Sequence, residues 1–448
     1  MKEGRNIPQI AVGILSATEI SVTLNSPHRV RESGLCLKGE WQVLSSGDRI
    51  ILKGGDIENN VENGIILDPE KEDKASFTIH SVTIGVDFHW QRLEDQVFRG
   101  CLKIISNKGK VTAINIISLE EYLKSVISSE MSATSSEELL KAHAVISRGW
   151  LLAQAEKRRK NAGKAADYIS DKRSDSEIIK WYDREDHADF DVCADDHCQR
   201  YQGITRETTP AVEKVIDATS GEVLTYNGKI CDTRYYKCCG GITELFENVW
   251  EPVNHPYLQK VIDNDAIPAG FNTNLTGDAD AEKWILGDPP AFCNTSDANV
   301  LKQVLNDYDQ ETNDFYRWNV KYSQQELSDL VRLKTGIDFG SITELKPLER
   351  GASGRIIRLE ISGTKKKMII GKELEIRKAL SKSHLYSSCF LVEKVEEQGV
   401  ISFILKGAGW GHGVGFCQIG AAVMGSKGYS YREILKHYFP GSVLEKKY

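Results

Sequence analysis

Four side chains of the kind that bind metal ions lie within one short polar stretch. In "DHADFDVCADDHCQRY", twelve residues hold His187, Cys193, His197 and Cys198. Two thiolates and two imidazoles complete a tetrahedral zinc shell with no position left for water, which is typical of a structural site. The spacing is not that of a zinc finger, and adjacent His and Cys ligands require an irregular loop. The sequence therefore predicts a small zinc-binding insertion at about residues 187–201. The alternative is that the four residues are unrelated polar residues of a loop.

A carboxylate stands at the end of a predicted helix. The run "SLEEYLKSVISSEM" repeats its apolar residues at helical spacing, and Ser118 with Glu121 forms a capping box at its start. Glu130 then lies near the negative end of the helix dipole, which opposes ionisation of the carboxylate, as a general acid requires. The alternative is a solvated glutamate at a frayed helix end.

A second helix is predicted at about residues 136–160, with Ser135 and Glu138 as its capping box. Arg148 lies in the middle of this helix. Its guanidinium is suited to pair either with a carboxylate of this chain or with a carboxylate of a substrate. Without such a partner it would be an ordinary surface arginine.

Glycine occupies every second position from Gly407 to Gly415 in "LKGAGWGHGVGFCQ". The spacing fits neither a Walker phosphate loop nor a dinucleotide fingerprint. Strict alternation is the period of a strand, so it predicts a strand with one bare face and with Trp410 and His412 on the other. For His412 the alternative is a buried, hydrogen-bonded histidine.

The elements that must position these residues indicate an α+β fold, in which mixed β-rich domains with a few helices flank a substrate groove. Charged residues 156–186 are expected to form a solvated helix end and loop, and Cys231, Cys238 and Cys239 are expected to be core thiols that could compete as metal ligands. The predicted parts are a β-rich part at 1–117, the helices and a strand segment at 118–262, an insertion or subdomain at 263–345, and a C-terminal β meander with the glycine strand and closing helices at 346–448.

Composition excludes several classes of protein. The chain has 57 basic and 64 acidic residues and no basic stripe, which argues against a nucleic-acid partner. It contains no apolar run long enough for a transmembrane segment and no signal-peptide stretch at its start. A cytoplasmic location is expected for the chain as written, or the cell envelope if a leader was removed.

Several stretches, in order along the chain, resemble the SpoIID/LytB family of stage II sporulation protein D and amidase-enhancer domains. They are "IAVGILSATEISVTL", "LEEYLKSVISSEMSATSSEELLKAHAVISRGW", "ATSGEVLTYNGKICDTRYYKCCGGITE" and "GWGHGVGFCQIGAAVMGSKGYSYREILKHYFPG". The sequence departs from the family pattern at Ser132, where proline is usual, and at Cys238, Cys239 and Cys417, where serine or another small residue is usual.

The resemblance implies a lytic transglycosylase that acts on the glycan strands of peptidoglycan, or on muropeptide fragments, with Glu130 as its acid and then its base. It also implies a structural Zn²⁺ held by His187, Cys193, His197 and Cys198. The glycine strand would form the floor of the groove, and the expected substrate-binding residues are Arg148, Trp410, His412 and Gln418.

Two other functions stay open. The amidase-enhancer branch implies a glycan-binding protein that activates a separate N-acetylmuramoyl-L-alanine amidase. A muramidase that uses water is the third possibility, although a hydrolase ordinarily needs a second, placed carboxylate.

Overall fold

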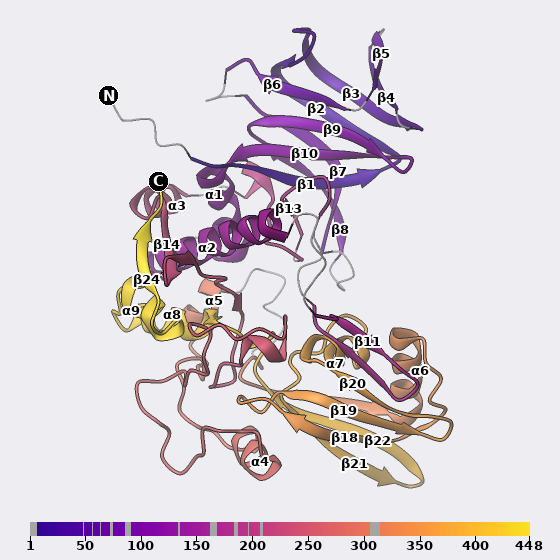
Figure 1. Ribbon diagram of the computed structural model, residues 1–448, viewed down its shortest axis with the longest axis vertical. Coiled ribbons are helices and arrows are strands. Elements are labelled where there is room, and N and C mark those ends of the chain that lie inside the picture. The colour runs from indigo at the N-terminus through magenta and orange to yellow at the C-terminus, as the bar shows by residue number, and fades with distance from the viewer. Residues whose placement is uncertain are drawn as a thin grey trace.

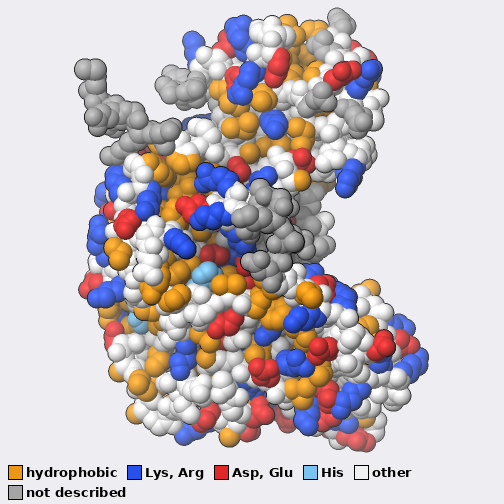
Figure 2. Space-filling view, viewed as in Figure 1, with side chains coloured by type: hydrophobic (Ala, Val, Ile, Leu, Met, Phe, Trp, Pro, Cys, Tyr) orange, Lys and Arg blue, Asp and Glu red, His pale blue; other side chains and the backbone are white. Residues whose placement is uncertain are grey.

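The computed structural model describes residues 7–47, 49–55, 57–62, 64–71, 75–85, 91–132, 135–161, 168–182, 187–195, 197–206, 209–304 and 314–448. Figure 1 shows an N-terminal sheet at the top, helices in the middle and a second group of strands at the lower right. The fold is therefore α+β and rich in strands, as predicted. Figure 2 shows that one side of the molecule is hollowed between the N-terminal sheet and the lower strands.

The N-terminal sheet is built from strands in which buried and exposed side chains alternate. In β3 (Cys36–Ser46), Leu37, Trp41 and Val43 are buried while their neighbours are more exposed, so one face of the sheet packs on the core. Within the described residues the strand order is β13-β1-β10-β9-β6-β2-β3-β4-β5, with β7 paired to β2 and β8 to β7. The other strands are β1 (Gln9–Ala17), β2 (Glu19–Val30), β4 (Arg49–Gly54), β5 (Ile57–Glu62), β6 (Ile65–Pro69), β7 (Phe77–Ile84), β8 (Arg92–Phe98), β9 (Cys101–Asn107), β10 (Lys110–Ser118) and β13 (Val192–Cys193).

Helix α1 (Leu119–Glu130) begins directly after β10, where the sequence predicts it. The hydroxyl of Ser118 accepts a hydrogen bond from the backbone N–H of Glu121 over 3.4 Å, which caps the helix. Its apolar face, including Leu123 and Val126, is fully buried. The capping serine and the apolar spacing together fix the helix that carries Glu130.

Helix α2 (Glu137–Asn161) has a different cap from the predicted one. Ser136, not Ser135, accepts a hydrogen bond from the backbone N–H of Leu139 over 3.3 Å. The hydroxyl of Ser135 instead donates to the backbone carbonyl of Gln303 over 2.8 Å. The start of α2 is thereby tied to a distant helix, α5 (Ala298–Val304), which local sequence pattern cannot reveal.

The middle of the molecule is completed by the last residues of the chain. Strand β24 (Val443–Lys446) pairs with β14 (Glu222–Tyr226), which also pairs with β15 (Lys229–Ile230). Helices α8 (Gln418–Ser426) and α9 (Tyr431–Tyr438) pack against α2, so the C-terminus lies near α3 (Pro210–Ala218) in Figure 1. A short parallel pair joins β16 (Tyr235–Tyr236) to β23 (Phe416–Cys417). Two short 3₁₀ helices, η1 (Gly203–Thr205) and η2 (Phe246–Asn248), lie before α3 and after β16 in the sequence.

The C-terminal strands form two sheets around a separate apolar core. Side chains such as Leu327, Ile356 and Phe403 are fully buried there. The strand orders among described residues are β11-β12-β20-β19-β18 and β17-β22-β21. The elements are β17 (Arg317–Ser323), α6 (Gln324–Thr335), β18 (Ile342–Arg350), β19 (Ile356–Gly363), β20 (Lys367–Gly371), α7 (Glu373–Ala379), β21 (Phe390–Glu397) and β22 (Val400–Ala408).

Part of the charged stretch 156–186 is strand rather than loop, so that expectation is wrong. β11 (Asp171–Arg173) and β12 (Glu177–Lys180) form a hairpin, and β12 adds in parallel to β20. Ile178 and Ile179 become buried in this pairing. The partner strand lies far along the sequence, so the charge pattern alone could not show it. Residues 162–167 and 183–186 lie outside the described part of the chain.

The predicted insertion at 263–345 contributes side chains to the core as well as to the surface. It contributes α4 (Asp278–Leu286) and α5, and Trp284 and Phe292 are almost completely buried. Its many Asp, Asn and Pro residues are typical of turns. A few large apolar side chains pack this segment against the rest of the molecule.

The glycine segment, residues 407–415, is not a continuous strand. β22 ends at Ala408, and Gly409, Gly411, Gly413 and Gly415 all have positive φ (77° to 105°). A side chain at these positions would collide with the chain at residues 234–239 or with the buried guanidinium of Arg355. The alternating glycines thus allow close approach of another part of the chain, which corrects the expectation of a strand with a bare face.

Candidate active site

Glu130 is the last residue of α1, as predicted, and its side chain is half-buried. The next residue, Met131, leaves the helix and donates its N–H to the carbonyl of Ile127 over 2.9 Å. The N–H of Ser132 then donates to the carbonyl of Gln303, also over 2.9 Å. The carboxylate therefore lies at the negative end of the helix dipole, next to a turn that α5 fixes in place.

A backbone donor from a distant segment reaches this carboxylate. The N–H of Arg200 donates a hydrogen bond to Oε1 of Glu130 over 3.2 Å. The same segment is fixed to α1 at two further points, because the N–H of Gln202 donates to the hydroxyl of Ser125 over 3.0 Å and the buried hydroxyl of Tyr122 donates to the side chain of Gln199 over 3.2 Å. Residues 199–202 thus run along the helix that carries Glu130.

The four predicted metal ligands come together directly before this segment. We call His187, Cys193, His197 and Cys198 the metal-ligand cluster; one ligand atom from each lies within 4.8 Å of all the others. The sulfur of Cys198 lies 3.4 Å from Nε2 of His187 and 3.5 Å from Nδ1 of His197, and the sulfur of Cys193 lies 3.8 Å from the same Nδ1.

These distances fit a tetrahedral zinc shell. With zinc–sulfur and zinc–nitrogen bonds of ordinary length, a thiolate and an imidazole ligand are about 3.6 Å apart. Hydrogen bonding from Cys198 and the two histidines lowers the pKa of the Cys193 thiol, which favours the thiolate form that a metal requires. Donor set and spacing therefore match the group that the sequence predicts.

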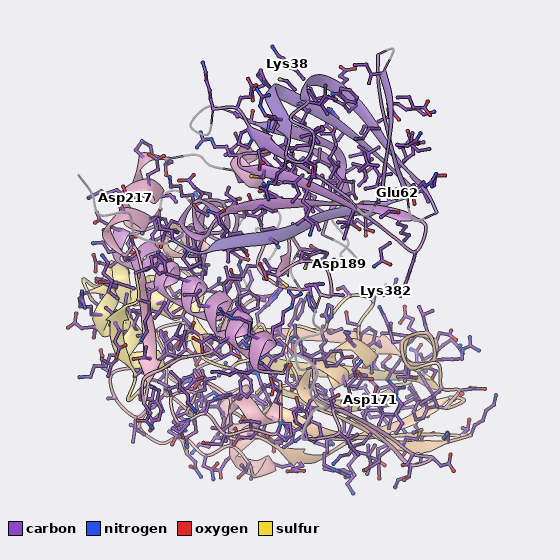
Figure 3. The ribbon with its side chains drawn as sticks, turned by 45° about the horizontal axis from the view of Figure 1, so that its top comes forward. Lys38, Glu62, Asp171, Asp189, Asp217 and Lys382 are labelled. Atoms are coloured by element: carbon purple, nitrogen blue, oxygen red, sulfur yellow. The ribbon has the colours of Figure 1, made fainter. Side chains whose placement is uncertain are left out.

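The metal-ligand cluster is held against the N-terminal sheet. β13, which contains Cys193, pairs in parallel with β1. Asn107 donates its side-chain amide to Asp189 over 3.1 Å. In Figure 3, Asp189 lies between the N-terminal sheet and the C-terminal strands, whereas Asp171 and Lys382 belong to the C-terminal side.

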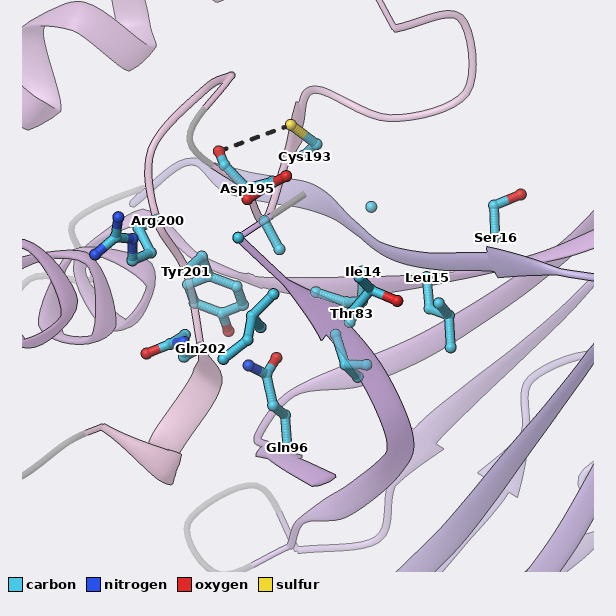
Figure 4. A pocket seen from close by; sticks show the side chains of 15 residues that line it. Ile14, Leu15, Ser16, Thr83, Gln96, Cys193, Asp195, Arg200, Tyr201 and Gln202 are labelled. Atoms are coloured by element: carbon cyan, nitrogen blue, oxygen red, sulfur yellow. Dashed lines mark hydrogen bonds between the residues drawn. The ribbon is translucent and has the colours of Figure 1, made fainter. Parts of the chain in front are cut away.

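A cavity of about 340 Å³ lies next to the cluster and is lined by β1, by β7 with the residue after it, by β8, and by residues 193–195 and 200–202. We call it the Gln96 cavity. Figure 4 shows Arg200, Tyr201 and Gln202 along one wall, with Cys193 and Asp195 at one end. Its volume lies at the lower end of the range, about 300–1,000 Å³, that small-ligand sites occupy. Arg200 lines this cavity and also bonds Glu130 through its backbone N–H, so one residue connects the cavity wall to the carboxylate, although Glu130 itself does not line the cavity.

The amide of Gln96 lines the same cavity and is completely buried. Neither its oxygen nor its nitrogen forms a hydrogen bond with any described residue. A buried amide without a partner costs about 1–3 kcal/mol, so such a group calls for an explanation.

Arg148 follows the first of its two predicted alternatives. Its guanidinium is fully buried and forms a bidentate pair with Glu120, with bonds of 2.9 and 2.7 Å. Glu120 also accepts hydrogen bonds from the N–H of Gly221 and the hydroxyl of Tyr448. The arrangement links α1, α2 and the C-terminus, which is a structural role.

His412 is the hydrogen-bonded histidine of the alternative interpretation. Its Nε2 donates to the carbonyl of Tyr235 over 3.0 Å, and its Nδ1 accepts from the N–H of Val414 over 3.1 Å. Burial lowers the pKa of His412 well below its usual value, so the ring is neutral. Both ring nitrogens are therefore used by the backbone.

Gln418 and Trp410 differ in exposure. Gln418 is buried, and its amide lies 3.3 Å from Nε2 of His143. Trp410 is half-buried, with its ring 4.2 Å from that of Tyr386 and 4.7 Å from that of Phe315. Of these two residues, only Trp410 is partly exposed.

Sequence reasoning missed Gln96 and the backbone of Arg200. A glutamine inside a strand carries no signal of its own, because its surroundings depend on residues more than a hundred positions away. One sequence signal for Arg200 was available, because Arg200 follows the predicted ligand Cys198 by two residues. A metal ion that fixes a loop also fixes the backbone of the residues directly after its last ligand.

None of the described helices combines the length and the apolar character needed to cross a bilayer. No disulfide joins the ten cysteines, all of which lie in the described part of the chain.

Comparison with known proteins gives two family matches. Residues 107–226 match the family described as Stage II sporulation protein, and residues 244–415 match one described as Domain of unknown function (DUF8618). The first range contains α1, α2 and the metal-ligand cluster.

Three relatives extend over more of the chain. An uncharacterized protein of Brachyspira hyodysenteriae is 26% identical over 344 residues, 77% of this chain and 71% of the relative. Stage II sporulation protein D of Bacillus amyloliquefaciens is 25% identical over 335 residues, 73% of this chain and 74% of that protein. The amidase enhancer of Bacillus subtilis is 28% identical over 242 residues, 52% of this chain but only 32% of the enhancer. Together with the match to residues 107–226, these similarities support the assignment of the chain to the SpoIID/LytB family.

Proposed function

We propose that this protein is a lytic transglycosylase that cleaves the bond between N-acetylmuramic acid and N-acetylglucosamine in peptidoglycan, with Glu130 as its acid and base. Membership of the SpoIID family and the similarity to an amidase enhancer support a cell-wall-related role. The observation that carries the finer proposal is the placement of Glu130. Its carboxylate stands at a helix end and accepts the N–H of Arg200, a residue that also lines the Gln96 cavity.

The proposed reaction needs a single carboxylate. Protonated Glu130 donates its proton to the glycosidic oxygen as the bond to C1 of the muramoyl residue breaks. The resulting carboxylate then takes the proton of the 6-hydroxyl of the same residue as that oxygen attacks C1. The products are a free N-acetylglucosamine 4-hydroxyl and a 1,6-anhydro-muramoyl end, and no water is consumed. Glu130 returns to its protonated form.

The Gln96 cavity is the proposed place for part of the glycan. N-acetyl and hydroxyl groups of a sugar offer both donors and acceptors, which would satisfy both atoms of the Gln96 amide. Trp410, which is partly exposed, is proposed as a further sugar contact. Arg148, His412 and Gln418 bond to groups of the chain itself and are not part of this proposal.

A structural Zn²⁺ held by His187, Cys193, His197 and Cys198 is also proposed. When bound, the ion supplies a fixed four-coordinate centre without an open position, so its contribution is to folding rather than to the reaction. Cys198 precedes Arg200 by two residues. Fixing the cluster would therefore fix the backbone N–H that orients the carboxylate of Glu130.

A second candidate function is a glycan-binding enhancer of an N-acetylmuramoyl-L-alanine amidase. The similarity to the B. subtilis amidase enhancer favours it, although the match covers about a third of that protein. In this case the cavity would bind glycan without cleaving it.

The test incubates the purified protein with peptidoglycan and with peptide-stripped glycan strands, followed by mass analysis of the soluble products. Glu130→Gln removes the proton donor with little change in shape. Glu121→Gln is the matched control, since it lies on the same helix and pairs with Lys124. Anhydro-muramoyl products are expected from the wild type and Glu121→Gln, with a loss of about 100-fold or more for Glu130→Gln.

Each other outcome selects a different function. Products heavier by one water identify a muramidase. Unchanged anhydro products from folded Glu130→Gln contradict the role of Glu130. No products from any variant, with glycan still bound and with faster product release by an added amidase, identify the enhancer.

A further inference from the structure

A second group of potential metal ligands lies deep in the molecule, away from the metal-ligand cluster. We call Cys239, Asp263, Cys293 and Cys417 the buried cysteine cluster. One ligand atom from each lies within 4.8 Å of all the others, and each residue is at most 3% exposed. The cluster is formed by four separate segments: the chain after β16, the loop before α4, the connection from α4 to α5, and β23.

The sulfur atoms are placed as in a metal site rather than in a disulfide. The sulfurs of Cys239 and Cys293 are 3.4 Å apart, whereas a disulfide bond is about 2.05 Å long. Two thiolates on one tetrahedral zinc ion are about 3.8 Å apart. A polynuclear iron–sulfur cluster needs a wider cage between its cysteines than this group offers.

Backbone donors are directed at two of the sulfurs. The N–H of Cys239 donates to the sulfur of Cys417 over 3.2 Å, and the N–H of Gly241 donates to the sulfur of Cys239 over 3.3 Å. Amide donors of this kind stabilise negative charge on sulfur and are typical of the surroundings of metal-bound thiolates.

Asp263 gives the cluster a carboxylate with no cation beside it among the described residues. The side chain is completely buried and accepts hydrogen bonds from two neutral donors, the hydroxyl of Tyr438 (2.6 Å) and the N–H of Cys293 (2.8 Å). A buried charge is costly unless it is paired or binds a metal. A side chain at position 420 would collide with Asp263, so Gly420 of α8 leaves the space in which this carboxylate fits.

We propose that Cys239, Asp263, Cys293 and Cys417 bind one Zn²⁺ as a closed structural site. Three thiolates and one carboxylate fill a tetrahedral shell, and full burial leaves no position for water or substrate. The ion would join the loops around Asp263 and Cys293 to the start of α8. Buried Arg355, which donates to the carbonyl of Cys239, supplies positive charge next to this anionic shell.

The neighbouring thiol of Cys238 is the obvious competitor for the fourth position. It is fully buried and interacts with the thiols of Cys293 and Cys417. The ligand atoms that lie within 4.8 Å of one another include that of Asp263, however, and not that of Cys238. We therefore assign the fourth ligand to Asp263.

The test measures metal content and cobalt spectra of the full chain produced with Zn²⁺ or Co²⁺ and dialysed against metal-free buffer. Two equivalents of zinc per chain are expected for the wild type. One equivalent is expected for His187→Ala/Cys198→Ser, which leaves only the buried cysteine cluster. The Co²⁺ form of that double variant is expected to show the intense thiolate-to-cobalt absorption of a tetrahedral site, because every residue of the buried cysteine cluster is unchanged.

Single substitutions identify the ligands. Cys293→Ser and Asp263→Asn are each expected to remove one equivalent, whereas Cys238→Ala keeps it. Cys231→Ala is the matched control, because Cys231 is a completely buried thiol outside the cluster, and it is expected to keep both equivalents. A result in which Cys238→Ala loses the ion and Asp263→Asn keeps it would overturn the assignment of Asp263.

Two results would overturn the site itself. One is a wild type with a single equivalent and a metal-free His187→Ala/Cys198→Ser double variant whose circular dichroism matches that of the wild type. The other is a count of eight thiols in denaturant instead of ten, with the mass of one disulfide. Neither measurement involves glycan cleavage. The proposed activity can therefore be disproved while the buried zinc site is confirmed, and the buried zinc site can be disproved while the activity is confirmed.

Discussion

The backbone N–H of Arg200 lies 3.2 Å from Oε1 of Glu130, although the two residues are 70 positions apart. A main-chain donor can be positioned only by the path of its chain. That path is set by the metal-ligand cluster on one side and by Gln202, whose N–H bonds Ser125, on the other. The environment of the candidate acid is therefore a product of how residues 187–202 fold.

Loss of the predicted zinc should reduce activity through this path. We expect Cys198→Ser to lower the zinc content by one equivalent and the glycan-cleavage rate by about 10-fold or more, as is usual when a supporting residue of a metal site is lost. Zinc analysis and product release measure the two effects. Cys36→Ser, at an exposed thiol of the N-terminal sheet, serves as control. Full activity in zinc-free protein would contradict the link between the cluster and Glu130.

Gln96→Leu should separate stability from activity. Leucine removes a buried amide that has no partner among the described residues, so we expect the free energy of unfolding to stay equal or rise by about 1 kcal/mol. Cleavage of glycan strands should fall about 10-fold, because a sugar would lose the amide. Urea unfolding and initial rates give the two values. Unchanged rates in a stable variant would mean that Gln96 does not bind substrate.

Arg148→Met should damage the fold rather than substrate binding. It leaves the carboxylate of Glu120 buried without its guanidinium, which costs about 3–5 kcal/mol. The double variant Arg148→Met/Glu120→Leu should recover part of this loss, and urea unfolding of the four proteins in the cycle measures the coupling. KM of the folded fraction should not change. A raised KM at unchanged stability would restore Arg148 as a substrate-binding residue.

Acid should destabilise the protein through buried neutral histidines. Burial lowers the pKa of His143 to about 3, so the folded state keeps it neutral while the unfolded chain takes up a proton below about pH 6.5. The free energy of unfolding therefore falls as pH decreases from 6.5 toward 3. Between pH 7.5 and pH 5 this one residue should account for a loss on the order of 2 kcal/mol.

His143→Gln tests that assignment. The substitution carries its own packing cost at pH 7.5, but the further loss on going to pH 5 should be smaller than in the wild type. Urea unfolding at the two pH values, with zinc present throughout, gives the comparison. An equal loss in both proteins would show that His143 does not titrate as described.

Local pattern predicted the parts of the site that depend on nearby residues. The cap at Ser118, the end of α1 at Glu130 and the meeting of His187, Cys193, His197 and Cys198 all arise within a dozen or so positions. The pairing of Arg148 with Glu120 was one of two alternatives, since a buried guanidinium needs an anion but the sequence does not name it.

The features that the sequence did not predict depend on contacts between residues far apart in the chain. Ile178 and Ile179 form a strand only because β20 lies beside them. The glycines at 407–415 looked like a strand because alternation was the visible signal. The positive φ of the four glycines from 409 to 415 instead accompanies close packing against residues 234–239 and against Arg355. Gln96 became notable only after segments from three parts of the sequence closed a cavity around it.

The buried cysteine cluster also sets an order of events during synthesis. The metal-ligand cluster lies within residues 187–198 and can close while the ribosome is still translating. The buried cysteine cluster needs Cys417, so Cys239, Asp263 and Cys293 wait for most of the remaining chain to be made. Contacts between distant segments are slow to form, and thiols that wait are open to oxidants. The nascent chain is thus most vulnerable to oxidation after Cys293 emerges and before α8 arrives to close the centre of the molecule.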